Sequence, residues 1–274
     1  MNAKQTRRTP IGFLLALIIP ALALSLTACK KPATSEAPAA PTVSKEQNSP
    51  DAKPALTNES KPPASATSNS PTRALVFRNV RSWRRKVDFE DVLTDLGYKF
   101  DVRSSAEMAG TDLAPYGLVI IPGAQWQDDY YRHYAENAER FDRYVTNGGK
   151  LVLELNGAER DGIPLPRGVS MVSHGALDNV ITLPDHPILT PLAGRPIHAN
   201  YASHGYLEGV PIDAIVLVTE MEQPRPTFIE YACGKGRVIA ACQCFHDQDG
   251  SGRGPLMPTV ISYAAEREWF SPKK

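Results

Sequence analysis

The stretch Leu118-Val-Ile-Ile-Pro-Gly123 decides the fold of this chain. Four consecutive apolar residues, most of them β-branched, are typical of a strand that is buried on both faces of a parallel sheet. Apolar residues then recur at helical spacing from 131 to 145, which predicts one amphipathic helix that stops at Asn147-Gly148-Gly149. A second strand pattern, Lys150-Leu-Val-Leu-Glu-Leu155, follows directly. This order predicts a βαβ unit, in which a right-handed crossover joins two parallel strands.

The same alternation extends upstream of this unit. Residues 73–77 form a short apolar run that suits a buried first strand. Apolar residues from 87 to 96 follow helical spacing, and Gly97 provides a stop signal. Residues 98–102 form another strand pattern. The chain therefore predicts a sheet of parallel strands with helical connections.

The pattern changes downstream. Residues 156–213 are rich in proline and irregular, with one short strand pattern at 180–183. Three further strands are expected at 214–219, 227–231 and 237–242. Gly234-Lys235-Gly236 joins the last two and is a hairpin signal. A final helix is expected over residues 255–269. The overall prediction is an α/β fold, with a mostly parallel sheet, a C-terminal β-hairpin and a final helix.

The N-terminal segment has the features of a targeting signal. Basic residues at positions 4, 7 and 8 precede an apolar run from Ile11 to Leu26, which ends in Leu26-Thr27-Ala28-Cys29. The pattern resembles the lipobox of bacterial lipoproteins, and the resemblance implies cleavage before Cys29 and lipid attachment to its thiol. A membrane-spanning anchor is the alternative, but this run is interrupted by Pro20 and is shorter than the roughly 20 apolar residues that a spanning helix needs. Residues 1–28 are therefore predicted to be a signal peptide that is absent from the mature protein.

Residues 29–72 are predicted to be a disordered tether. Proline, alanine, serine, threonine and lysine dominate after Cys29, and no aromatic residue is present, so this segment cannot bury enough apolar surface to order itself. The chain is thus expected to be exported and anchored to a lipid membrane. Lysines rather than aspartate follow Cys29, which in Gram-negative lipoproteins implies the outer membrane, facing the periplasm.

Residues 73–274 are long enough to bury one sizeable core. The whole chain has 30 basic and 30 acidic residues and a formal net charge of zero. The net charge of the chain therefore gives no indication of nucleic acid as a partner.

Four segments in this domain resemble the class I glutamine amidotransferase-like superfamily. They are Leu118–Gly123, Phe141–Val152, Leu183–Ile188 and Ile229–Ile239. The resemblance implies a flavodoxin-like, doubly wound fold for residues 73–274. It is greatest to the non-glutaminase branches found near sugar-utilisation and envelope proteins.

The residues after Lys150–Leu155 argue against glutaminase activity. Glutaminases of this superfamily place a nucleophilic cysteine on a sharp turn at this point. Here the turn is Asn156-Gly157-Ala158-Glu159, and no cysteine, serine or threonine lies between Leu155 and Gly168. The sequence therefore excludes glutaminase and cysteine-protease activity, and it favours a protein that is not an enzyme.

The loop after the first strand is a candidate ligand site. It contains Arg81, Trp83, Arg84 and Arg85. In doubly wound sheets such loops line the ligand crevice, and the helix N-terminus that follows favours anions. The arginines are therefore candidates for binding a phosphate or carboxylate, with Trp83 as a stacking surface. A solvated basic face is the alternative.

Four further residues are candidates for the same crevice. Asn156 follows a central strand, although a plain turn also explains it. His204 follows Ser203 on an extended segment, where adjacent side chains point in opposite directions, and a structural histidine is the alternative. His246 and Asp247 open a glycine-rich loop that aspartate turns alone would also explain. Because this loop lacks the ligands of a full calcium loop, we predict no metal and no cofactor.

Cys233, Cys242 and Cys244 are expected to be buried thiols. The hairpin signal separates Cys233 from Cys242, and two cysteines two apart on one strand face have unfavourable geometry for a disulfide.

The sequence therefore predicts a membrane-anchored envelope lipoprotein, with a catalytically inactive amidotransferase-like domain that acts in ligand binding or scaffolding. Its expected partners are a small anionic or sugar ligand and an envelope protein. The alternative is a carbohydrate- or cell-wall-related enzyme with a pocket at the strand carboxyl ends.

Overall fold

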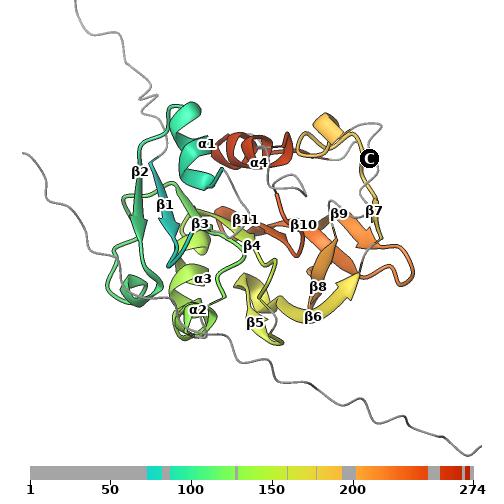
Figure 1. Ribbon diagram of the computed structural model, residues 1–274, viewed down its shortest axis with the longest axis horizontal. Helices are drawn as coiled ribbons and strands as arrows, with labels where there is room; N and C mark the ends of the chain where they lie inside the picture. Colours follow the sequence, from blue (N-terminus) through green and yellow to red (C-terminus); the bar gives the residue numbers. More distant parts are fainter. Residues whose placement is uncertain are drawn as a thin grey trace, which may run out of the picture. The chain divides into compact units, whose positions relative to one another are not determined.

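The structure is a computed structural model, and the fold is that of a mixed α/β domain (Figure 1). The described residues are 73–81, 87–126, 129–158, 160–176, 178–192, 202–245, 254–266 and 269–271. The predicted signal peptide, Cys29 and the tether lie outside these ranges. Within them, no helix has the length and apolar character that crossing a membrane requires.

An eight-stranded sheet forms the centre of the domain. In spatial order its strands are β2 (Phe100–Arg103), β1 (Ala74–Phe77), β3 (Leu118–Ile121), β4 (Lys150–Glu154), β11 (Gly236–Ala241), β10 (Pro226–Cys233), β9 (Ile215–Glu220) and β7 (Asn179–Ile181). The strands from β2 to β11 run parallel, and β10, β9 and β7 continue the sheet in antiparallel pairings. The predicted α/β fold with a mostly parallel sheet and a C-terminal hairpin is confirmed.

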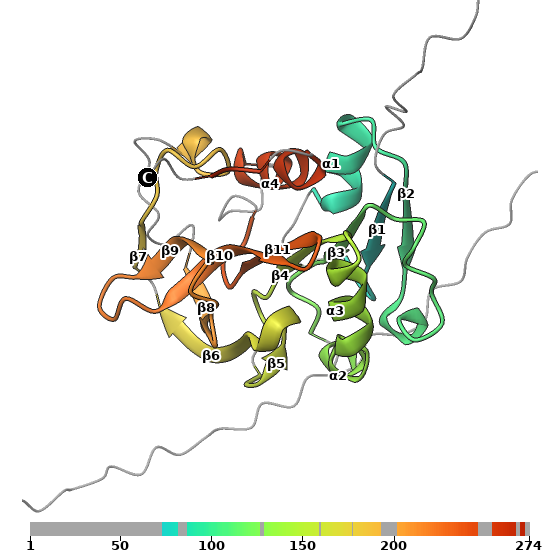
Figure 2. The ribbon, with the colours of Figure 1, turned by 180° about the vertical axis from the view of Figure 1, so that it is seen from behind.

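Helices cover both faces of the sheet (Figures 1 and 2). On one face, α1 (Phe89–Asp95) and α4 (Leu256–Ala265) pack their apolar side chains against the sheet in one core cluster. On the other face, α2 (Tyr130–Glu136) and α3 (Ala138–Thr146) contribute to a second cluster. Each apolar helix stripe therefore has a sheet face to cover, which is what makes a parallel sheet stable.

Two predicted helices differ from the observed ones. The single helix expected over 131–145 is divided at Asn137, whose backbone leaves the helical region and whose side-chain Nδ2 donates to the His133 carbonyl at 2.8 Å. Asparagine competes with the helix for its own backbone groups, which explains the break. The final helix ends at Ala265 rather than at 269, because Glu266 is already extended.

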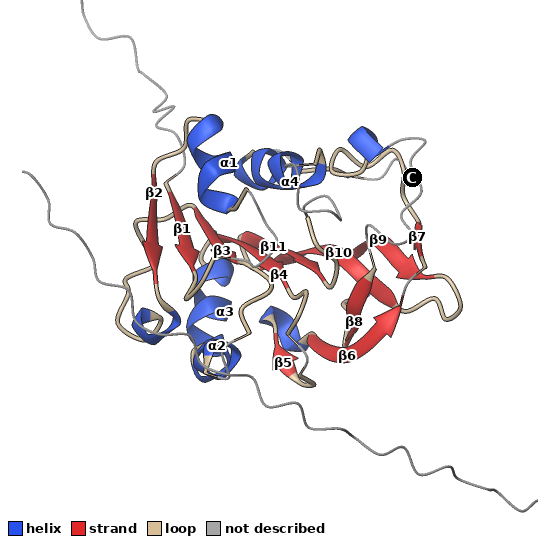
Figure 3. Cartoon of the chain, viewed as in Figure 1, coloured by secondary structure: helices blue, strands red, loops and turns tan. Residues whose placement is uncertain are grey.

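The irregular middle of the chain contains a small second sheet that the sequence did not predict (Figure 3). It consists of β5 (Ile163–Pro164), β6 (Ser170–Ala176) and β8 (Ser203–Glu208), all antiparallel. Its buried side chains, including Met171 and Leu207, join the same core cluster as α2 and α3. Because β6 and β8 are separated by more than 25 residues, their pairing left no local hairpin signal.

Candidate functional site

The carboxyl ends of β1, β3, β4 and β11 meet at one edge of the sheet, which we call the carboxyl edge. Its turns comprise residues 78–81, 122–126, 155–158 and 242–245. Ligands of open α/β sheets bind at this position. All but one of the predicted ligand-binding residues of the domain belong to these turns or to the segments that follow them, and His204 lies on β8.

Gln125 joins the turn after β1 to the turn after β3. Its Oε1 accepts from the backbone N–H groups of Asn79 at 2.9 Å and Val80 at 3.2 Å, while its Nε2 donates to the Val80 carbonyl at 2.9 Å. The side chain is almost completely buried. Both ends of the amide are therefore used to fix the position of the β1 turn.

Glu154, the last residue of β4, joins two neighbouring turns to its own strand. Its carboxylate is fully buried and accepts from Gly123 N at 3.0 Å and from Phe245 N at 2.9 Å. A buried carboxyl group needs such hydrogen-bond partners to offset the cost of its burial. The turns after β3 and β11 are therefore bound to β4 through one side chain.

Tyr130 closes the same edge from α2. Its hydroxyl donates to the Phe77 carbonyl at 2.6 Å. Burial raises the pKa of Tyr130 well above its ordinary value, and Tyr131, Tyr134 and the Glu154 charge raise it further. The phenol thus stays protonated and keeps its donor role.

The turn after β3 is strained and tightly packed. Ala124 adopts a left-handed backbone with φ of 56°, and its N–H donates to the Asn156 carbonyl at 2.6 Å. A β-carbon at Gly123 would lie 3.0 Å from the carbonyl oxygens of Glu154 and Asn156, so a larger residue would crowd two backbone groups. Strained non-glycine residues cluster at functional sites, where the surrounding structure holds them in place.

Trp126 provides an aromatic surface at this edge. Its side chain is 44% exposed, and its ring lies over Gly157, where an added β-carbon would be 3.3 Å from Cη2. Gly157 also has a positive φ of 72°, so the turn after β4 is shaped to leave room for the indole. An exposed tryptophan held against a glycine turn is suited to contact a ligand.

Asn156 is the polar centre of the edge. It is 6% exposed, its Nδ2 donates to the Sγ of Cys244, and its Oδ1 has no hydrogen-bond partner among the described residues. A buried amide oxygen without a partner is costly, and such a group in a native fold calls for an explanation. The described residues thus leave the Asn156 oxygen without a donor, next to the turn residue Gly157 on which Trp126 packs.

Arg81 is placed at the edge but is engaged with acidic residues. Its guanidinium is 61% exposed, with Nε 3.4 Å from Asp88 Oδ2 and Nη2 3.9 Å from Asp91 Oδ1. Glu90, in the same first turn of α1, pairs with Arg78. Carboxylates thus occupy the helix N-terminus that the sequence suggested for anions. Trp83, Arg84, Arg85, His246 and Asp247 lie outside the described residues.

His204 lies beside residues 242 and 243, which directly follow β11. Its N–H donates to the Cys242 carbonyl at 2.9 Å, and Ser203 forms a β-bridge with Gln243. Ser203 is buried and His204 exposed, as an extended backbone requires. The structure therefore brings Asn156 and His204 to the two flanks of residues 242–244.

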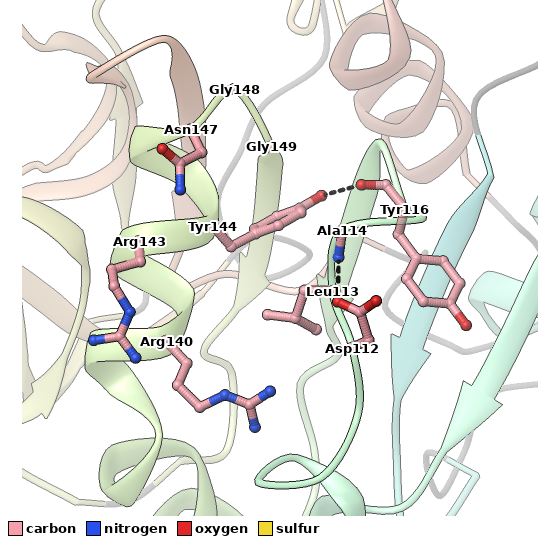
Figure 4. A pocket seen from close by; sticks show the side chains of 10 residues that line it. All are labelled: Asp112, Leu113, Ala114, Tyr116, Arg140, Arg143, Tyr144, Asn147, Gly148 and Gly149. Carbon is pink, nitrogen blue, oxygen red and sulfur yellow. Dashed lines mark hydrogen bonds between the residues drawn. The ribbon is translucent and has the colours of Figure 1, made fainter.

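A separate groove lies at the amino end of the parallel strands (Figure 4). Its volume is about 510 Å³, and α3 and the segment before β3 line it; we call it the α3 groove. Arg140 donates to the carbonyl of Thr111 at 2.7 Å and to those of Met108 and Ala109, and Tyr144 Oη donates to the Tyr116 carbonyl at 3.1 Å. These polar groups hold the groove's own walls together.

The described part of the chain contains no group of three or more His, Cys, Asp or Glu side chains that could hold a metal ion.

Gln125 and Trp126 belong to the edge but were not predicted from the sequence. Their position directly after the strand Leu118–Ile121 was the available signal, because that is where ligand loops begin.

Comparisons with known proteins give distant similarities. No family model matches the chain. An uncharacterised protein of Clostridium acetobutylicum is 22% identical over 200 residues, which are 71% of this chain and 20% of that protein, so the match spans about a fifth of the relative's length.

Three solved structures are distantly similar to the chain. A putative GMP synthase component from Thermoplasma acidophilum has a TM-score of 0.44, with 13% identity over 70% of this chain and 95% of that one. A cytoplasmic protein from Salmonella typhimurium has a TM-score of 0.43, with 14% identity over 70% and 98%. A β-galactosidase from Bacillus circulans has a TM-score of 0.43, with 16% identity over 71% and 30%. Similarity at this level carries no statement about activity.

Proposed function

We propose that this chain is an exported lipoprotein, anchored through Cys29, whose α/β domain binds a small sugar or anionic ligand at the carboxyl edge. The observation that supports binding is the Oδ1 atom of Asn156, which is buried and has no partner among the described residues. A ligand hydroxyl or amide group would donate to it. Such a contact would offset the cost of burying that oxygen alone.

Trp126 supports a ligand with an apolar ring face. Its indole is 44% exposed beside Gly157, on the same pair of turns as Asn156. Sugar rings combine an apolar face with hydroxyl groups, which matches an aromatic surface next to an amide oxygen. For an anionic substituent, the proposed partners are the arginines that the sequence predicts for anion binding, Arg81, Arg84 and Arg85.

Amide hydrolysis is not part of this proposal. The turn after β4 presents Asn156 where glutaminases of the resembling superfamily carry cysteine. The N–H of Gly123 donates to Glu154, so it is not available to stabilise an oxyanion. Glu154 itself is fully buried and holds two backbone donors, which leaves it poorly placed for acid–base work.

The alternatives are a carbohydrate- or cell-wall-related enzyme and a scaffold for an envelope protein. Trp126 favours the first, since an exposed aromatic surface also suits a sugar substrate. Turnover of envelope glycans by the purified chain would favour the enzyme. A specific protein crosslink in cells, with no effect of small ligands on stability, would favour the scaffold.

Metabolic labelling with a clickable fatty acid tests the anchor. We expect label on the chain and recovery with membranes, with both lost in Cys29→Ala. Cys244→Ala is the matched control, because it removes a different thiol and should keep the label. Label that persists in Cys29→Ala would contradict the anchor.

Thermal unfolding of the full chain tests the ligand. The probes are neutral hexoses, hexuronic acids and hexose phosphates. A compound present at 100 times its Kd stabilises by about 2.7 kcal/mol, or about 5–10 °C for a domain of this size. The shift should disappear in Asn156→Ala and Trp126→Ala but remain in Asp112→Ala, which changes the α3 groove. Ligand shifts that survive both edge substitutions would place the site elsewhere.

A further inference from the structure

The carboxyl edge of the sheet continues beyond β11. Because β10 runs antiparallel to β11, it places Phe228 beside Ala241, the last residue of β11. β9 in turn runs antiparallel to β10 and places Thr219 beside Pro226. Residues 221–225, which join β9 to β10, therefore form a hairpin at the same edge as the turns after β3, β4 and β11.

Arg225, the last residue of this hairpin, is held by an almost fully buried carboxylate. Its Nε and Nη2 lie 2.6 and 2.5 Å from Oε2 of Glu220, and its backbone carbonyl accepts from Glu220 N at 3.0 Å. Two nitrogens on one carboxylate fix the orientation of the guanidinium plane and balance its charge. The hairpin therefore presents a rigid, charge-balanced arginine.

Tyr206 of β8 and His174 of β6 form an aromatic surface against this arginine, and we call these three side chains the hairpin platform. Arg225 Cζ lies 4.1 Å from the centroid of the Tyr206 ring, and the His174 ring meets that ring edge-on at 6.2 Å. His174 is exposed and Tyr206 half-buried. The platform is thus a second aromatic surface, besides Trp126, that a ligand can contact from solvent.

β8 connects the hairpin platform to the turn after β11. This strand packs beside β10 (Figures 1 and 2), and its His204 N–H donates to the Cys242 carbonyl. Alternate residues of a strand share a face, and Ser203 and Gly205 are buried. His204 and Tyr206 therefore lie on the outward face of β8, which leads from the edge to the platform.

The two aromatic surfaces are too far apart for one sugar ring to contact both. Trp126 lies over the turn after β4, whereas Arg225 begins the return from β9. Neighbouring strands are about 4.8 Å apart, so the steps from β4 through β11 and β10 to β9 span roughly 14 Å. Two aromatic surfaces at this separation suit a chain of rings, each with an apolar face and polar hydroxyl groups.

The charges described at this edge favour a neutral chain. Three of its guanidinium groups share one feature, a carboxylate within pairing distance: Arg78 with Glu90, Arg81 with Asp88, and Arg225 with Glu220. An anionic ligand would compete with these carboxylates. A sugar hydroxyl would instead accept from guanidinium N–H groups that the pairs leave unused.

We propose that the carboxyl edge binds a neutral oligosaccharide, with one ring on Trp126 and a later ring on the hairpin platform. This inference rests on the ligand-binding function proposed above and extends it from a single sugar to a chain. Trp126 serves the first position, and Tyr206 and His174 determine the preference for length.

Calorimetric titration of the full chain with cello-, malto- and chito-oligosaccharides of increasing length tests the proposal. In at least one series, Kd should fall about fivefold once the chain reaches the platform, because one aromatic contact contributes about 1 kcal/mol. Tyr206→Ala should remove this gain and leave the Kd of the disaccharide unchanged. Tyr98→Ala is the matched control, since this half-buried tyrosine lies just before β2, at the amino end of the strands. It should keep the gain.

His174→Ala is a second variant that does not threaten the fold, because this side chain is exposed. It should weaken binding of the longest chain and not of the disaccharide. Equal affinity for all lengths, with binding that still depends on Trp126, would overturn the platform and leave the proposed function standing. Absence of binding in every series would overturn both. Tighter binding of oligogalacturonate than of the neutral chains would overturn the neutral assignment.

Discussion

The carboxyl edge and the α3 groove lie at opposite ends of the parallel strands and differ in how their polar groups are used. The groove offers about 510 Å³ of space, but its arginine and tyrosine side chains bind the groove's own backbone. The carboxyl edge contains a buried carboxylate that binds two turns to β4, a strained alanine and an amide oxygen with no partner among the described residues. The two ends therefore differ in whether their polar side chains bind the walls of a groove or fix the turns around a buried acceptor.

The largest difference should appear when a carboxylate at each end is changed to its amide. Glu154→Gln turns one acceptor of a buried side chain into a donor that faces a backbone donor, so we expect a loss of about 3 kcal/mol in the free energy of unfolding. Asp112→Asn changes an exposed side chain that accepts one bond, from Ala114 N at 3.0 Å. Its expected loss is below about 0.5 kcal/mol. Urea unfolding measures both, and similar losses would remove the contrast.

A glycine at each end gives the next largest difference. Gly123→Ala would place a β-carbon 3.0 Å from two backbone oxygens, which should destabilise the fold by about 2 kcal/mol. Gly110, in the segment between β2 and β3, has no atom within 4 Å of the same position. Gly110→Ala should therefore be neutral to within about 0.5 kcal/mol. Thermal unfolding would detect the difference, and a neutral Gly123→Ala would mean that the edge can relax.

Tyr144→Phe tests whether the Tyr144 hydroxyl in the α3 groove serves to stabilise the fold. The phenol donates to the Tyr116 carbonyl at 3.1 Å and accepts from Lys150 N at 3.3 Å. We expect a loss of about 1 kcal/mol, since two backbone groups would lose a partner. Ligand-induced stabilisation should be unchanged in this variant. A loss of ligand response would instead assign the binding site to the groove.

The smallest expected effect is a pH dependence of the free energy of unfolding. It arises at Asp101, which accepts a hydrogen bond from the groove residue Tyr116. The Tyr116 hydroxyl, which donates to Asp101, lowers the pKa of that carboxyl below its ordinary 3.8, and Arg73 and Arg103 contribute in the same direction. A depressed pKa adds stability above pH 3.8 that is lost as the pH falls through the folded-state value. The stability gap between the native chain and Tyr116→Phe should therefore narrow below about pH 4. Melting curves from about pH 6 to about pH 2.5 would reveal it, and a gap that widens on acidification would contradict the assignment.

Local pattern was enough to predict most of the parallel sheet. The runs at 118–121 and 150–154 are consecutive apolar residues, which have few alternatives to a buried strand. The small sheet of β5, β6 and β8 left no comparable trace, because pairing between distant strands is decided by which surface remains uncovered. The break at Asn137 depended on one side-chain hydrogen bond that apolar spacing does not report.

The candidate site was likewise only partly predictable from the sequence. Sequence placed Asn156 and the β1 loop at strand carboxyl ends, since chain order fixes where parallel strands finish. It treated Cys244 as a packing residue and could not place its contact with Asn156, because the two residues are 88 positions apart in the chain.

By itself, the sequence determined the α/β class, the order of the central strands' connections and the absence of a nucleophile after β4, because these follow from local apolar runs and residue identity. The lipid anchor at Cys29 remains a prediction from the sequence. The tertiary structure alone decided that Glu154 binds two turns to β4, that Trp126 lies on Gly157 and that Asn156 meets Cys244. Those contacts join turns that are far apart in the chain, and only the register of the folded sheet brings them together.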